Sequence, residues 1–354
     1  MQSNTQARLS RSPLVIGFPG SEFTQQQLQF IHEFRPFGLM ITRDNIVSKS
    51  QLSDLIKDFK QAVGEEFVMV TTDQEGGRIQ YLEGSEWQTY PIYGDFSQLA
   101  ERDIELAKKA AYKTSHTMAT EMAQLGFNAN CGPVLDLLVG GADTVMSNRC
   151  FHSDPKIAAE LASVYVQGHM DAGVMPMLKH IPGHGRATED SHKTTPSIDT
   201  PLDELDRTDF FPFSQLKSAP MAMVAHVVFS NVDDKPASIS AKTVDELIRN
   251  RIGFEGCLIS DCVYMESLSG PLELRCQQVQ EAGVDLVLAC HGDVEEWYKW
   301  QENLRPLSSE SLIRLERAMI NTAKANLEKT INLADEMTQI EAILATEQLN
   351  ICIV

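Results

Sequence analysis

The stretch DPKIAAELASVYVQGHMDAGVMPMLKHI, residues 154–181, contains one complete helix–strand unit. Asp154 and Pro155 are typical of a helix start, because Asp caps the first turn and Pro fits its geometry, and Gly173 is typical of a helix end. The following segment, 174–181, is apolar at most positions and does not alternate with polar residues. Such a run indicates a parallel strand that is buried on both faces.

The same order of apolar strand and periodic helix recurs along the whole chain. Strands are expected at 13–18, 37–42, 67–72, 127–137, 174–181, 221–229, 256–260 and 284–290. Further helices are expected at 99–125, before Gly126, and from Ser240 to Gly253. Eight strands that alternate with helices predict an α/β protein with a single (β/α)8 TIM-type barrel, and a doubly wound sheet is the weaker possibility.

The domain organisation is simple. No linker, repeat or low-complexity tract divides the chain, and residues 306–350 are charged and helix-periodic. We therefore expect residues 1–354 to form a single domain, with a barrel core at about 13–330 and a C-terminal helical extension to 354.

Composition excludes several classes of partner. The formal net charge of −19 argues against a nucleic acid, because affinity for phosphates comes mainly from Lys and Arg. The seven cysteines are scattered without a CxxC pair, which favours buried free thiols. The N-terminus lacks an apolar core of signal-peptide length, and no apolar run approaches ~18 residues. We expect a cytoplasmic protein with neither a nucleic-acid nor a membrane partner.

Four polar clusters coincide with the ends of expected strands, where barrels carry their catalytic groups. They are TDQEGGR at 72–78, KHIPGHGRATEDSH at 179–192, His226 in the sixth strand and Asp261 at the tip of the seventh. Lys179 ends an apolar strand, and because burying a lone charge is costly, it favours a binding role.

Each cluster also has a purely structural interpretation. Asp73 can cap the turn at Gly76 and Gly77, and Asp261 can cap a helix that begins near Tyr264. His226 fits a hydrogen-bonded core histidine, and His184 fits a residue that shapes its loop through backbone hydrogen bonds.

Two functional hypotheses compete for the histidine-rich loop. His180 and His184, together with Asp190 and His192, can supply nitrogen and oxygen ligands to zinc. The intervening IPG, however, cannot form the helix that normally places histidines four apart on one face. In the competing hypothesis, Asp190 orients His192 as a proton carrier, and Asp261 is a nucleophile.

The motifs KHIPGHG…DSH, DQEGGR, AHVVFSNVDDKPASIS and ISDCVYME, and their order along the chain, resemble glycoside hydrolase family 3. More narrowly, they resemble its single-domain bacterial β-N-acetylglucosaminidases of peptidoglycan recycling, over about residues 13–300. The resemblance implies a (β/α)8 barrel that removes terminal β-linked N-acetylglucosamine with retention, and that uses no metal or organic cofactor. It also implies a small carbohydrate substrate, either an N-acetylglucosaminyl-anhydromuramyl peptide or a chitooligosaccharide.

The resemblance also assigns roles to individual residues. Asp261 corresponds to the nucleophile, and His192, assisted by Asp190, to the general acid/base. Four residues correspond to groups that hold sugar hydroxyls: Asp73, Arg149, Lys179 and His180.

The chain departs from the family pattern at several positions. Tyr81 stands where arginine is usual, Ile181 where phenylalanine is usual, and Cys262–Val263–Tyr264 follow the nucleophile where the family has DLS. These departures leave open a member with altered sugar specificity. The sequence is also compatible with a β-hexosaminide phosphorylase, a metal-dependent hydrolase or a sugar-binding barrel without turnover.

Overall fold

The computed structural model describes residues 11–65, 67–137, 139, 149–187, 194–322 and 331–350. Eight parallel strands form its centre: β1 (Leu14–Ile16), β2 (Gly38–Ile41), β3 (Met69–Thr72), β6 (Ala129–Asn130), β7 (Met175–Ile181), β9 (Met221–Val224), β11 (Cys257–Ser260) and β12 (Val287–Ala289). Each lies within one of the eight strands predicted from the sequence.

These strands close into a barrel. They pair in two four-stranded sheets, in the orders β12-β1-β2-β3 and β11-β9-β7-β6. The sheets join where the N–H of Cys131 donates to the carbonyl of Thr72 (3.0 Å), and where Ile259 bridges Leu286 in parallel. The prediction of a (β/α)8 barrel is therefore confirmed. Four short strands lie outside the barrel: β4 (Gln74–Gly76) with β5 (Ile79–Gln80), and β8 (Ser197–Ile198) with β10 (Val228–Phe229).

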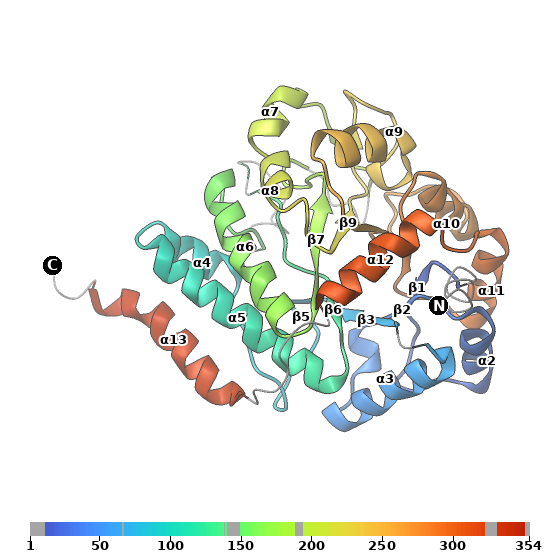
Figure 1. Ribbon diagram of the computed structural model, residues 1–354, viewed down its shortest axis with the longest axis horizontal. Helices are drawn as coiled ribbons and strands as arrows, with labels where there is room; N and C mark the ends of the chain where they lie inside the picture. Colours follow the sequence, from blue (N-terminus) through green and yellow to red (C-terminus); the bar gives the residue numbers. More distant parts are fainter. Residues whose placement is uncertain are drawn as a thin grey trace.

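Helices surround the barrel (Figure 1). The helical segments are α2 (Gln25–Phe34), η1 (Arg43–Asn45), α3 (Lys49–Val63), α4 (Tyr93–Ala100), α5 (Ile104–Leu125), α6 (Pro155–Asp171), α7 (Leu202–Arg207), α8 (Phe210–Gln215), η2 (Ala237–Ile239), α9 (Ala241–Thr243), η3 (Val244–Arg251), α10 (Leu272–Glu281), α11 (Val294–Asn303), α12 (Ser309–Thr322) and α13 (Leu333–Asn350). Within the described part of the chain, none of the helices combines the length and the hydropathy that a membrane span requires.

Local capping explains where the predicted helices agree with the structure and where they differ. Asp154 caps α6 by accepting hydrogen bonds from the backbone N–H groups of Lys156 and Ile157, as its sequence predicts. The single helix expected at 99–125 is instead two helices, α4 and α5, because Asp103 caps a new start by accepting from Leu106 N–H. The helix expected after Ser240 begins as α9 and continues as the π-helical η3.

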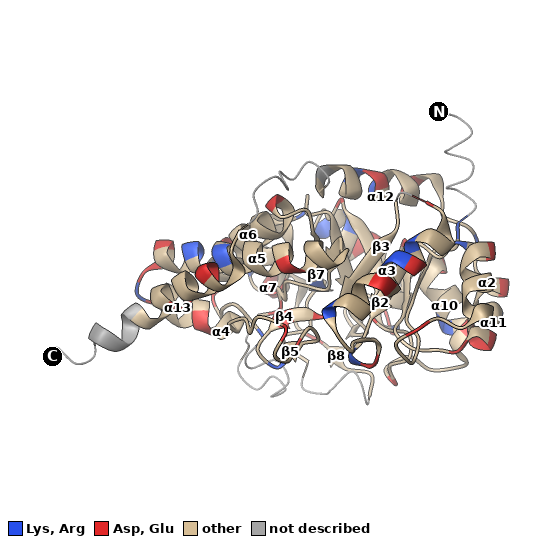
Figure 2. Ribbon diagram, turned by 90° about the horizontal axis from the view of Figure 1, so that it is seen from below, with Lys and Arg blue, Asp and Glu red and all other residues tan. Residues whose placement is uncertain are grey.

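Apolar side chains fill the barrel and close one of its ends, which leaves the other end for chemistry. Side chains such as Met175 and Met177 fill the barrel interior, where Leu315 and Met319 of α12 join them. Figure 2 shows α12 at one end of the barrel, with β4, β5 and β8 at the other. The helix of the C-terminal extension, α13, packs on α5 and α4.

The described cysteines are free thiols, as expected. Cys131, Cys150, Cys257, Cys262 and Cys276 are buried and Cys290 is partly buried. Cys352 lies outside the described residues.

Candidate active site

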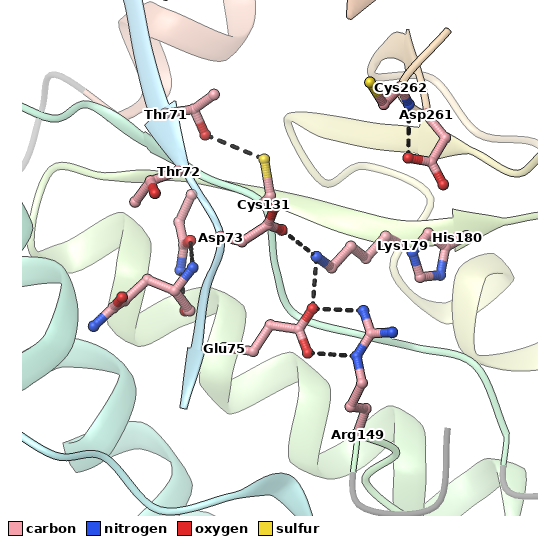
Figure 3. Close-up of polar contacts among 12 residues, drawn as sticks. Thr71, Thr72, Asp73, Glu75, Cys131, Arg149, Lys179, His180, Asp261 and Cys262 are labelled. Atoms are coloured by element: carbon pink, nitrogen blue, oxygen red, sulfur yellow. Dashed lines mark hydrogen bonds and ion pairs between the residues drawn. The ribbon is translucent and has the colours of Figure 1, made fainter. Parts of the chain in front are cut away.

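Lys179 is the centre of a buried ionic cluster at the open end of the barrel (Figure 3). Its Nζ lies 2.7 Å from Oδ1 of Asp73 and 2.6 Å from Oε1 of Glu75. Asp73 follows β3 directly, whereas Glu75 lies on β4. Burial opposes the charge, but the two carboxylates raise the pKa of Lys179 above its usual value. The lysine is therefore a fixed cation.

Glu75 joins this lysine to Arg149. Nε of Arg149 lies 2.8 Å from Oε2 of Glu75, and Nη2 lies 2.7 Å from Oε1, so the pair is bidentate. Burial alone would raise the pKa of Glu75, but Lys179 and Arg149 lower it to about 2. The Asp73 side chain is 20% exposed, against 2–3% for Glu75 and Lys179. The cluster therefore presents Asp73 to the barrel mouth and keeps Glu75 behind it.

His180 is oriented by a second buried carboxylate. Nδ1 of His180 lies 2.7 Å from Oδ2 of Asp136, whose side chain is fully buried. The backbone N–H groups of His180 and His184 also donate to Asp136. Burial opposes ionisation, but His180 and the other donors lower the pKa of Asp136. Asp136 fixes the ring and leaves Nε2 as the nitrogen that faces away from it.

Asp261 lies at the same level of the barrel as His180. Both Ile181 of β7 and Ser260 of β11 are in register with Val224 of β9, which separates the two strands. The N–H of Asp261 donates to the carbonyl of Val224 (3.0 Å). His180, one residue before the end of β7, and Asp261, directly after β11, therefore lie at the same end of the barrel, as Figure 3 shows.

The surroundings of Asp261 favour its ionised form. Burial would raise its pKa, but the imidazoles of His180 and His226 and the N–H of Cys262 lower it below the usual value. That N–H donates to Oδ1 at 2.7 Å. Asp261 is thus a carboxylate with the charge that a nucleophile requires.

The structural interpretation of His226 is confirmed. This histidine is fully buried, and its ring contacts Ser238 Oγ (2.6 Å) and the carbonyl of Cys262 (3.0 Å). The backbone N–H of His184 bonds to Asp136, in agreement with a role in shaping its loop. The Asp73 carboxylate contacts Lys179, a role beyond capping a turn.

Sequence reasoning missed Glu75 and Asp136 as site residues. Glu75 stands two positions after Asp73 in an extended segment, and this spacing puts both side chains on one face. That spacing was a usable signal. Asp136 is an acidic residue inside the apolar run of the expected strand 127–137, which is the kind of signal that singled out Lys179. Its partner could not be predicted, because His180 is 44 residues away.

The structure brings Asp73, Arg149 and Lys179 into one cluster, with His180 and Asp261 at the same end of the barrel. Asp190 and His192 lie outside the described residues. Among the residues that are described, no group of three or more His, Cys, Asp or Glu side chains is arranged to hold a metal ion.

A closed parallel barrel with ionised side chains gathered at the carboxyl ends of its strands defines the (β/α)8 barrel enzymes. Residues 15–324 match the glycosyl hydrolase family 3 N terminal domain. The chain belongs to this family, as its motifs predicted.

Curated relatives and solved structures agree with this assignment. The beta-hexosaminidase of Bordetella avium (strain 197N) is 32% identical over 82% of this chain and 83% of its own length, and that of Xylella fastidiosa (strain 9a5c) is 33% identical over 79% and 84%. NagZ from Neisseria gonorrhoeae, solved with N-trifluoroacetyl-D-glucosamine, has a TM-score of 0.83 at 27% identity, covering 95% of this chain and 99% of that one. The family 3 beta-N-acetylglucosaminidase from Paenibacillus sp. str. FPU-7 also has a TM-score of 0.83 at 27% identity, covering 95% and 67%.

Proposed function

We propose that this chain is an exo-acting, retaining β-N-acetylglucosaminidase that works as a single domain. The observation that carries the proposal is the ionised Asp261 at the same end of the barrel as the Asp73–Lys179 pair. A retaining glycosidase needs a carboxylate nucleophile beside groups that hold the sugar. Membership of family 3, with relatives named beta-hexosaminidase, supports the choice of sugar.

The proposed reaction has two displacements. First, the Asp261 carboxylate bonds to the anomeric carbon while the glycosidic bond breaks, and His192 gives its proton to the departing oxygen. Next, water attacks the same carbon and gives a proton to His192, and Asp261 is released as a carboxylate. Asp190 accepts the other ring N–H of His192 and stabilises the imidazolium.

The ionic cluster has the chemistry needed to hold sugar hydroxyls. Asp73 supplies acceptor oxygens, Lys179 and Arg149 supply cationic donors, and His180 supplies a ring nitrogen. Ion pairs hold these groups in place before substrate arrives: Lys179 pairs with Asp73, Arg149 with Glu75, and His180 with Asp136. This lowers the cost of ordering them on binding. We propose N-acetylglucosaminyl-anhydromuramyl peptides or chitooligosaccharides as substrates, hydrolysed in the cytoplasm.

Covalent trapping tests the central assignment. A 2-fluoro or 5-fluoro sugar with a good leaving group should form a stable ester on Asp261, to be located by digestion and mass spectrometry. Asp261→Asn should abolish labelling and nearly all turnover while the fold is retained. Asp44→Asn is the matched control, because Asp44 is an exposed aspartate that follows β2 at the same end of the barrel. A label on any other carboxylate contradicts the proposal.

Product analysis separates this reaction from its competitors. Sugar-1-phosphate formed in the presence of inorganic phosphate would identify a phosphorylase. Activity lost to a strong chelator and restored by zinc would identify a metal-dependent hydrolase. Chromogenic N-acetylglucosaminide, N-acetylgalactosaminide, glucoside and glucosaminide define the sugar, and no turnover of any of them would leave a sugar-binding barrel.

A further inference from the structure

A buried amide holds the backbone between the two carboxylates of the ionic cluster. Asn130, fully buried at the end of β6, accepts the N–H of Gln74 on Oδ1 (3.1 Å) and donates from Nδ2 to the carbonyl of Gln74 (2.8 Å). Gln74 is the residue between Asp73 and Glu75. Both polar groups of this one residue's backbone are therefore satisfied by a single side chain.

His169 of α6 fixes the orientation of that amide. Nδ2 of Asn130 lies 2.9 Å from Nε2 of His169, and because an amide NH2 only donates, Nε2 accepts. The ring proton is then on Nδ1, which donates to Oγ of Ser115 (2.6 Å), and Ser115 donates to the carbonyl of Tyr165. Burial lowers the pKa of His169 to about 3, so the ring is neutral at working pH.

This chain of hydrogen bonds has one consistent set of donors and acceptors. If the Asn130 amide flipped, its NH2 would oppose the N–H of Gln74 and its oxygen would oppose both the Gln74 carbonyl and Nε2 of His169. The network therefore fixes the position and direction of the Gln74 backbone.

We propose that Asn130 and His169 are positioning residues that hold the Asp73 and Glu75 carboxylates at ion-pair distance from Lys179. Side chains alternate along an extended segment, so Asp73 and Glu75 point to Lys179, while the Oε1 of Gln74 accepts the N–H of Leu82 (3.1 Å). A shift of the Gln74 backbone would move both carboxylates together. The inference rests on the proposed sugar-binding role of this cluster.

Asn128 provides a matched comparison within the same strand region. Its Oδ1 accepts the N–H of Val70 (2.8 Å), and its Nδ2 donates to the carbonyl of Val68 (2.7 Å). This amide also bonds one backbone N–H and one backbone carbonyl, but they belong to two residues at the start of β3, away from Asp73. A merely structural amide at either position would affect stability and leave sugar binding alone.

The experiment compares Asn130→Ala with Asn128→Ala for kcat, KM, Tm and the inhibition constant of N-acetylglucosamine. Misplacement of binding groups by about 1 Å can cost about 100-fold. We expect Asn130→Ala to lower kcat/KM by about 10- to 100-fold and to raise the inhibition constant in proportion. Asn128→Ala should lower Tm and leave both kinetic values within about twofold of wild type.

A second pair of variants tests the role of His169. His169→Gln keeps an acceptor for Asn130 and should retain most of the sugar affinity, whereas His169→Leu removes the acceptor and should resemble Asn130→Ala. This pair also replaces the first comparison if Asn130→Ala does not fold. Equal kinetics for His169→Gln and His169→Leu would overturn the positioning role. Equal kinetics for Asn128→Ala and Asn130→Ala would overturn it as well.

Lys179→Met, measured in parallel, separates this inference from the proposed site. If Lys179→Met weakens sugar binding but Asn130→Ala does not, the positioning role alone is wrong. If Lys179→Met leaves sugar binding unchanged, the sugar-binding assignment is wrong and the positioning role falls with it.

Discussion

Replacing Glu75 by Gln is expected to destabilise the protein strongly at neutral pH and little in acid. The carboxylate is 2% exposed and pairs with both Lys179 and Arg149. Its pKa is lowered from 4.5 to about 2 against the cost of burial. A pKa shift of one unit between the unfolded and folded states corresponds to about 1.4 kcal/mol, so this ionisation contributes about 3 kcal/mol to the free energy of unfolding.

The sign of the pH dependence follows from the direction of the shift. A carboxyl whose pKa is lower in the folded state contributes its full stability above the unfolded pKa, near 4.5. That contribution is lost as the pH falls from about 5 towards about 2. Breaking a buried ion pair typically costs about 3–5 kcal/mol, so Glu75→Gln should lose that much at pH 7.

Urea unfolding of wild type and Glu75→Gln from pH 7 down to the acid limit of folding measures this difference. Glu83→Gln is the control, because Glu83 pairs with Arg43 at the surface, where both side chains are about half exposed. An exposed pair is worth about 0–1 kcal/mol. A loss for Glu75→Gln no larger than for Glu83→Gln, or one that does not shrink in acid, would refute the reasoning.

Two further predictions concern turnover. His192→Ala should lower the rate about 10²–10⁴-fold on a glycoside with a poor leaving group, and far less on one whose phenol leaves unaided. Asp190→Ala should show the same pattern more mildly, and an equal loss on both kinds of substrate would contradict proton transfer by His192. The ring of Tyr81 lies 4.5 Å from the Arg43 guanidinium. Tyr81→Arg should lower KM for the N-acetylglucosaminide or change the order of preference among the four chromogenic substrates. An arginine donates charge-assisted hydrogen bonds where a phenol donates one neutral bond, so unchanged kinetics on all four would show that position 81 does not face the sugar.

The barrel strands were predictable because their signal is local. The strand Met175–Ile181 begins with four apolar residues that do not alternate with polar ones, since both faces are buried, and this pattern is visible within seven consecutive residues. Asp261, Lys179 and His180 could be placed at the open end for the same reason: each stands at the end of such a run. The break between α4 and α5 was less visible, because one capping aspartate interrupts an otherwise continuous periodicity.

The contacts that organise the site depend on closure of the barrel, which brings distant parts of the chain together. Glu75 meets Lys179 and Arg149 across 104 and 74 residues, and Asn130 meets Gln74 across 56. The periodicity of the sequence does not identify such partners, because the chain has many Asp, Glu and Asn residues and nothing in the local pattern distinguishes one from another as the partner. Which residues become partners is decided when β3, β6 and β7 become neighbours in the barrel.

The sequence by itself therefore determined the strands, the barrel and the family, because periodicity and short motifs are properties of neighbouring residues. Only the tertiary structure decided that Glu75 lies behind Asp73 as the shared partner of two cations, that Asp136 orients His180, and that Asn130 clamps the segment between the two carboxylates. The physical reason is that a buried charge or amide is stable only beside a specific partner, and closure of the barrel supplies that partner.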